Sequence, residues 1–235
     1  MDANAIETTL AAADRELAAG RLPELRALGF WRAVAAVKRD RRLVARYADR
    51  IAHIDRATFV RAVPLHTSAA VGIVLLFLGF ALGILLLGVA EPFDRPWREL
   101  VLLAAAGALD ATTHGLAHFL VGTAVGIRYT DAFVDLPKKP QPGLKIDYAS
   151  YLRASATGRA WMHASGAIAT KLTPFVVIPY ALAIRCDAWA IVVLLAIGVL
   201  QIATDVLFSV KASDWKKFRR EMRLARRSTA WVDDR

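Results

Sequence analysis

The sequence contains one cysteine, Cys186, among 235 residues. A single thiol cannot form an intramolecular disulfide, nor can it supply the paired sulfur ligands of a cysteine-based zinc site. The scarcity of cysteine therefore excludes a disulfide framework and the common structural zinc motifs.

Signatures of other protein classes are also missing. The chain has no zinc-finger spacing and no aromatic-basic RNA motif, although its net charge is +10. The first sixty residues are charged throughout and lack the apolar core of a signal peptide. Because the zinc-finger and RNA-binding motifs are missing, we expect no nucleic-acid partner. The positive charge instead predicts contact with an anionic membrane surface.

Charge is absent from several long stretches, and 56% of all residues are hydrophobic. Four segments are long enough to cross a hydrocarbon core about 30 Å thick at about 1.5 Å per residue. They cover approximately residues 65–90, 100–127, 160–184 and 188–210. The sequence thus predicts an all-α integral membrane protein with four transmembrane helices.

The expected domain organisation follows from these spans. Residues 1–62 predict an N-terminal amphipathic helical cytoplasmic region, residues 63–211 the membrane domain, and residues 212–235 a basic amphipathic tail on anionic lipid. Asp40 is expected to cap a helix in the first region and Asp214 to cap the tail helix. Between spans two and three, β-forming residues and the turn-rich PKKPQPG predict a short β-hairpin or re-entrant segment.

The basic residues also predict orientation. Six Lys or Arg occur in residues 128–159 and nine from residue 211 onward, against two in residues 91–99 and one in residues 185–187. The positive-inside rule predicts that both termini lie in the cytoplasm. We expect the protein to be located in the plasma membrane.

Five ionisable residues interrupt the predicted spans, and such residues mark function by default. They are Asp110, His114, His118, Lys171 and Asp205. Asp110, His114 and His118 recur every four residues, so they form one stripe on span two.

Two histidines at i and i+4 can give a metal ion two nitrogen ligands from one helix. Spans two and four run in the same direction, and Asp205 lies at a depth compatible with His118. His114, His118, Asp205 and a water would complete a tetrahedral site, so we expect one Zn²⁺ per chain. Asp110, one turn away, is expected to hydrogen-bond His114 or to act as a base.

The same residues have a purely structural interpretation. Asp110 or Asp205 can pair with Lys171 in a buried polar cluster that only specifies packing. His163 on span three is expected to be a packed or interfacial histidine, and its functional alternative is a fourth ligand or a substrate-facing group. Lys171 is expected to form an ion pair or to extend towards the interface, and its functional alternative is to face the substrate or to support the ligands.

The stretch HGLAHFLVGTAVGIRYTDAF (114–133) resembles the metal-binding helix of site-2 proteases, the intramembrane zinc metalloproteases. SGAIATKLTPF (165–175) and ATDVLFS (203–209) are similar in position to that family's second motif and its aspartate-ligand motif. The resemblance covers residues 100–210. It implies zinc ligands at His114, His118 and Asp205, and hydrolysis of membrane-spanning substrates.

The sequence departs from that family at the catalytic position. The family's glutamate follows the first histidine and acts as general base, whereas this chain has Gly115. The aspartate motif lacks its glycine, and the second motif lacks its asparagine. The resemblance therefore allows either an active peptidase or a pseudoprotease that keeps the zinc site.

Two other functions fit the same residues. A haem-binding electron-transfer protein would use His163 with His114 or His118 as axial ligands. An ion- or proton-coupled transporter would use Asp110, Lys171 and Asp205 as a relay. The oligomeric state is left open by the sequence.

Overall fold

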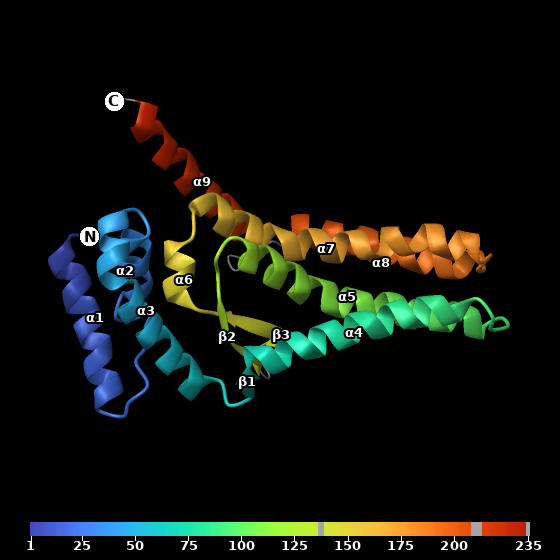
Figure 1. The fold of residues 1–235 in the computed structure, drawn as a ribbon, viewed down its shortest axis with the longest axis horizontal. Helices are drawn as coiled ribbons and strands as arrows, with labels where there is room; N and C mark the ends of the chain where they lie inside the picture. Colours follow the sequence, from blue (N-terminus) through green and yellow to red (C-terminus); the bar gives the residue numbers. More distant parts are fainter. Residues whose placement is uncertain (136–138, 208–212, 234–235) are drawn as a thin grey trace. The chain divides into compact units, whose positions relative to one another are not determined.

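The computed structural model describes residues 1–135, 139–207 and 213–233 of the chain. It is mostly helical, with one small sheet, and it contains four helices long and apolar enough to cross a membrane (Figure 1). The chain divides into two compact units: residues 1–70 with 123–155, and residues 71–122 with 156–235. This division cuts across the three consecutive segments expected from the sequence.

The first unit begins with three amphipathic helices, α1 (Ala3–Ala18), α2 (Phe30–Val37) and α3 (Arg41–Ala62). Their apolar faces enclose one core, whose fully buried side chains include Ile6, Leu10, Phe30, Val37, Ile51 and Ile54. Asp40 caps α3 as predicted, because its carboxylate accepts a hydrogen bond from the Arg42 amide at 2.7 Å. The short helix α6 (Tyr148–Arg153) adds Ala149 and Leu152 to this core.

A three-stranded antiparallel sheet completes the first unit. Its order is β1 (His66–Ser68), β2 (Tyr129–Asp135) and β3 (Lys139–Ile146), with His66 paired to Phe133 and Phe133 to Gly143. The expected hairpin between spans two and three is therefore present. The first predicted span began too early, because residues 66–68 pair with β2 and the helix starts at Ala69.

The second unit contains the four candidate spans. They are α4 (Ala69–Ala90), α5 (Trp97–Ala124), α7 (Ala156–Ala183) and α8 (Ala188–Leu207), each starting or ending within a few residues of its prediction. Large apolar side chains of α4, such as Leu75, Leu78 and Leu85, remain exposed. So large an apolar surface favours lipid as its surroundings, and it indicates a membrane-embedded protein.

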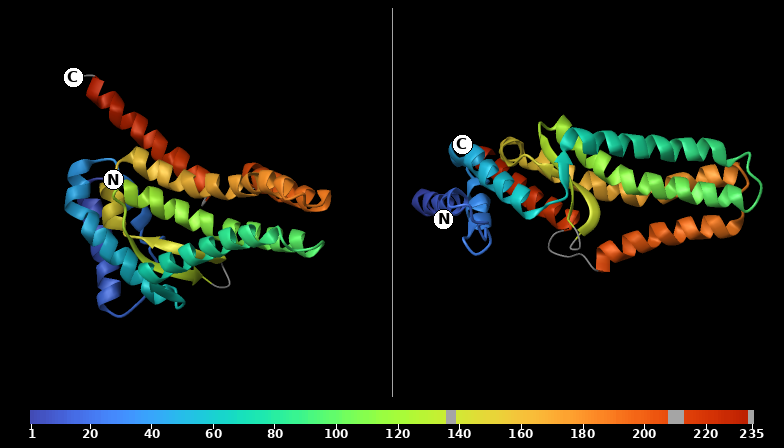
Figure 2. Two further views of the ribbon diagram at one scale, coloured as in Figure 1. Left: turned by 45° about the vertical axis from the view of Figure 1, so that its right-hand side comes forward. Right: turned by 90° about the horizontal axis from the view of Figure 1, so that it is seen from below.

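The last helix, α9 (Asp214–Asp233), also belongs to the second unit. It packs along the first part of α7, and both Figure 1 and Figure 2 show the two helices side by side. Edge-to-face stacking of Trp161 on Phe218, with ring centroids 5.6 Å apart, forms part of this contact. The tail is thus packed against a span instead of standing apart as a separate segment.

Candidate metal centre

The two histidines of α5 lie one helical turn apart and face α7. The Nδ1 atom of His118 lies 2.6 Å from the backbone carbonyl of Met162, and the Nδ1 atom of His114 lies 3.0 Å from the hydroxyl of Thr170. The Nε2 atoms of the two rings lie 3.1 Å apart. Both imidazoles are therefore held from behind by α7, and their outer nitrogens converge.

These partners assign the tautomers of both rings. A carbonyl oxygen can only accept, so Nδ1 of His118 donates to Met162. The Thr170 hydroxyl gives its own proton to the Gly166 carbonyl at 2.9 Å, so its oxygen accepts from Nδ1 of His114. With Nδ1 as the donor, the neutral form of each ring would present an Nε2 lone pair to the same point, which is the form that a metal ligand requires.

A carboxylate from α9 completes the group. Oδ2 of Asp214 lies 3.5 Å from Nε2 of His114 and 3.3 Å from Nε2 of His118. Tetrahedral coordination with metal–ligand bonds of about 2.0–2.1 Å requires ligand atoms about 3.3–3.4 Å apart. The triangle of 3.1, 3.3 and 3.5 Å matches that spacing. Among the described residues, His114, His118 and Asp214 form the group of His, Cys, Asp or Glu side chains whose ligand atoms lie close enough together to hold a metal ion.

Asp214 is held ready for this role. Its second oxygen, Oδ1, lies 3.0 Å from the ammonium group of Lys217, which leaves Oδ2 directed at the histidines. Burial raises the pKa of the Asp214 carboxyl, but the neighbouring His118 and Lys217 outweigh burial and hold that pKa below its usual range. The group is therefore ionised at neutral pH.

The sequence assigned Asp214 a different role. As the first residue of α9 it was predicted to be the helix cap, but Ser213 accepts the hydrogen bonds from the Lys216 and Lys217 amides. The Asp214 carboxylate is consequently available to the histidines. From sequence, an acidic residue at a helix start can be either a cap or a ligand. The signal that could have indicated a ligand is that Asp214 is the first carboxylate after span four.

Gly166 on α7 makes room for the His118 ring. A methyl group added at its Cα would lie 2.4 Å from Nε2 of His118 and 2.7 Å from Cε1. Any larger residue would push the ring out of the position that it occupies. The glycine in the 165–175 stretch is therefore required by the close approach of an imidazole.

Asp205 was predicted as the third ligand, but the carboxylate that lies beside the two histidines is that of Asp214. Oδ2 of Asp205 lies 2.6 Å from the ammonium nitrogen of Lys171, which also donates to the Ala167 carbonyl. The opposite charge one helix away is the physical reason. Asp205 forms the ion pair that the structural interpretation of Lys171 predicted.

Asp110 and His163 do not belong to the group of His114, His118 and Asp214. Oδ2 of Asp110 accepts from the Gln201 amide at 2.9 Å, and Thr170 supplies the partner of His114 that was expected from Asp110. His163 is buried on α7 within electrostatic reach of Asp214 and Lys217. Sequence reasoning missed Thr170, whose only signal is a hydroxyl inside a predicted span.

Gly115, which follows the first histidine, faces α4. A methyl group added there would lie 2.9 Å from Cδ1 of Leu76. The nearest atom is the flexible end of a leucine side chain. A Cβ at this position would therefore require the Leu76 side chain to shift.

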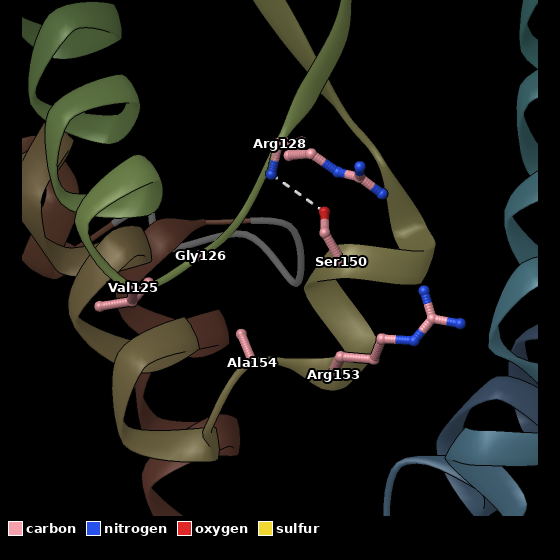
Figure 3. A pocket seen from close by; sticks show the side chains of 6 residues that line it. All are labelled: Val125, Gly126, Arg128, Ser150, Arg153 and Ala154. Atoms are coloured by element: carbon pink, nitrogen blue, oxygen red, sulfur yellow. Dashed lines mark hydrogen bonds between the residues drawn. The ribbon is translucent and has the colours of Figure 1, made fainter.

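The first unit has a pocket of about 300 Å³ lined by six residues, Val125, Gly126, Arg128, Ser150, Arg153 and Ala154 (Figure 3). Its hydroxyl is engaged structurally, because Ser150 accepts from the Arg128 amide at 2.9 Å and donates to the Asp147 carbonyl. Figure 3 shows both arginine side chains extending away from Val125. The pocket thus holds no activated nucleophile, and the metal centre is the stronger candidate site.

No protein-family model, curated protein or solved structure matches this chain.

Proposed function

We propose that this chain is a membrane-embedded zinc protein of the site-2-protease-like kind, with His114, His118 and Asp214 as its ligands. The observation that carries the proposal is the triangle of two imidazole nitrogens and one carboxylate oxygen with sides of 3.1–3.5 Å. Two lone pairs and a negative charge converge there, and a divalent cation satisfies all three. Two nitrogens and one oxygen suit zinc well.

Several residues around the three ligands would hold them in position for zinc. Met162 and Thr170 fix the two ring tautomers, Lys217 fixes the carboxylate, and Gly166 leaves space for the His118 ring. A zinc ion held by three protein ligands keeps a fourth position open and supplies Lewis-acid chemistry. The side chain of His114 is 44% exposed, so the open position is accessible on its side.

Of the two forms of this function, we propose the pseudoprotease, which retains the metal and binds membrane-spanning segments. Gly115 carries no group that can accept a proton, and Asp110 is held by Gln201. A peptidase of this kind needs a base at hydrogen-bonding distance from the reacting water. No such carboxylate adjoins the two histidines within the described residues besides Asp214, which serves as ligand.

The deciding experiment measures zinc per chain in detergent-purified protein. Wild type and Asp205→Asn are expected to hold about one zinc, while Asp214→Asn and His118→Ala lose it. Asp205→Asn is the matched control, because it makes the same change on a neighbouring carboxylate. Should that variant misfold, Lys171→Leu/Asp205→Leu removes both charges of the pair. Zinc retained in Asp214→Asn but lost with Asp205 would overturn the ligand assignment.

One observation favours a second function, an ion- or proton-coupled transporter. Two polar pairs lie inside the spans, Asp110 with Gln201 and Lys171 with Asp205. Oδ1 of Asp110 is buried without a hydrogen-bond partner. Buried ionisable groups of this kind line proton and ion paths in transporters. Cation uptake into proteoliposomes that is abolished by Asp110→Asn and unaffected by Asp214→Asn would favour this function over the first.

The haem function has less support from the geometry. It requires His163 to share one iron with His114 or His118, whereas the Nε2 atoms of both of these histidines face Oδ2 of Asp214, at 3.5 and 3.3 Å. We retain the prediction that the protein lies in the plasma membrane with both termini in the cytoplasm, which the distribution of Lys and Arg supports.

A further inference from the structure

The exposed face of α9 is basic over residues 214–226, the part of the helix whose side chains the structure describes. Every exposed side chain there is a lysine or arginine: Lys216, Arg219, Arg220, Arg223 and Arg226. Their spacing of three and four residues places them on one side of the helix. We call these five residues the basic stripe.

The opposite face of α9 packs on α7 and reaches the metal centre. Glu221 is fully buried and accepts from the guanidinium of Arg159 at 2.7 Å, and Phe218 stacks on Trp161. Asp214, at the start of the same helix, supplies the carboxylate to the histidines. One rigid helix thus carries a metal ligand on its inner face and the basic stripe on its outer face.

The stripe also lies near a membrane boundary. α8 has 20 residues, Ala188–Leu207, which span about 30 Å and so match the hydrocarbon thickness. The stripe starts nine residues after α8 ends, at Lys216. Clusters of four to eight cations next to a span attract the anionic headgroups of the cytoplasmic leaflet. The absence of any exposed carboxylate among residues 214–226 makes this attraction uniform along the stripe.

We propose that the basic stripe binds anionic phospholipid headgroups and that this contact raises the zinc affinity of the metal centre. The inference rests on the proposed zinc function. Lipid contact favours α9 in the place seen here, and that place is where Asp214 completes the ligand set. Without Asp214 only two nitrogens remain, and a two-ligand site binds zinc more weakly. By linkage the effect is reciprocal, so zinc also strengthens the contact of α9 with anionic lipid.

The test uses the full chain in nanodiscs of phosphatidylcholine alone or with added phosphatidylserine. Zinc affinity is measured by competition with a chelator at low and high salt. We expect binding about fivefold tighter or more with phosphatidylserine, and loss of this gain at high salt. Arg219→Gln/Arg223→Gln should abolish the gain. Arg15→Gln/Arg26→Gln, which removes two exposed arginines from the first unit, should retain it.

A second readout reports lipid contact without zinc. An environment-sensitive fluorophore is attached at Lys216→Cys in a Cys186→Ser chain, and its emission is compared in the two lipids. A phosphatidylserine-dependent change with equal zinc affinity in both lipids overturns the coupling and leaves the proposed function intact. No change with phosphatidylserine overturns the lipid assignment. No zinc in either lipid, in folded protein, removes the proposed function and the coupling together.

Discussion

At the scale of single residues, the metal centre depends on a glycine as much as on its ligands. The His118 ring lies where a side chain of residue 166 would be, with 2.4 Å between its Nε2 and the missing Cβ. Real carbon–nitrogen contacts are more than 1 Å longer, at about 3.5–4.0 Å. The ring and the helix backbone fit together only because α7 has no side chain there.

We therefore expect Gly166→Ala to displace the His118 ring and weaken zinc binding by about tenfold to a hundredfold, as loss of ligand positioning commonly does. Gly107→Ala on α5 is the matched control, because nothing lies within 4 Å of its added methyl group. The control should bind zinc like the wild type. Chelator competition gives both affinities, and equal affinities for the two variants would contradict the role of Gly166.

A second residue, Gly115, allows a test that separates zinc binding from hydrolysis. Gly115→Glu restores the carboxylate of the resembled family, and Leu76→Ala removes the side chain that it would meet. We expect the double variant to bind zinc and to cleave a membrane-spanning peptide that the wild type only binds, because general bases contribute about 10²–10⁴-fold in rate. Cleavage is followed by mass spectrometry. The same variant with His118→Ala is the control, and cleavage that persists in it would point to a contaminating protease.

At the scale of elements, α9 depends on one buried ion pair. The side chains of Arg159 and Glu221 are 4% and 0% exposed, and their 2.7 Å contact joins α7 to α9. A buried pair is costly to break, since the remaining charge has no compensation. This pair therefore fixes the helix that brings Asp214 to the histidines.

Glu221→Ala should lower the free energy of unfolding by about 3–5 kcal/mol and weaken zinc binding, because it removes the buried carboxylate that pairs with the Arg159 charge. Arg159→Met/Glu221→Leu replaces the pair by apolar groups and should recover most of both losses. Thermal unfolding and chelator competition measure the two effects. If the single variant lost stability but kept full zinc affinity, the pair would not position Asp214.

The helix α6 offers a pH-dependent prediction. Burial raises the pKa of its cap, Asp147, but hydrogen bonds from Ser150 and Ala149 and the charge of Arg128 outweigh burial and lower that pKa. A carboxyl whose pKa is lowered on folding stabilises the fold above its unfolded value of about 3.9, and this contribution is lost as pH falls through the folded pKa.

We accordingly expect Asp147→Ala to reduce the protection of α6 amides against hydrogen exchange by about 1 kcal/mol between pH 5 and 7. The difference from wild type should shrink as pH falls below about 4, because the wild-type cap becomes protonated. A difference that stayed constant down to acid pH would show that ionisation of Asp147 does not contribute.

At the scale of the whole molecule, the four candidate spans predict how the chain crosses the membrane. Four crossings would place both termini on one side, and the positive-inside rule predicts that this side is the cytoplasm. Topology reporters fused at either terminus should report the cytoplasm, and one inserted at residues 91–96 should report the opposite side. Cytoplasmic signals from residues 91–96 would remove at least one span from the topology.

The sequence by itself predicted the long helices. Its apolar runs identify four candidate spans by length and composition, and Asp40 caps α3 through a local hydrogen bond. The stripe of His114 and His118 followed from the helical repeat alone. All of these features depend on residues near in sequence, so the amino-acid order suffices to predict them.

Only the tertiary structure decided between the carboxylates. Asp205 and Asp214 lie on different helices, and no local pattern tells which of them meets a histidine of α5. Asp205 forms an ion pair with Lys171. Asp214 lies beside the histidines because α9 packs on α7, a contact that includes the ion pair of Arg159 and Glu221. Which carboxylate joins the two histidines depends on which helix faces pack together. Such contacts between distant segments cannot be predicted from the spacing of residues along one helix.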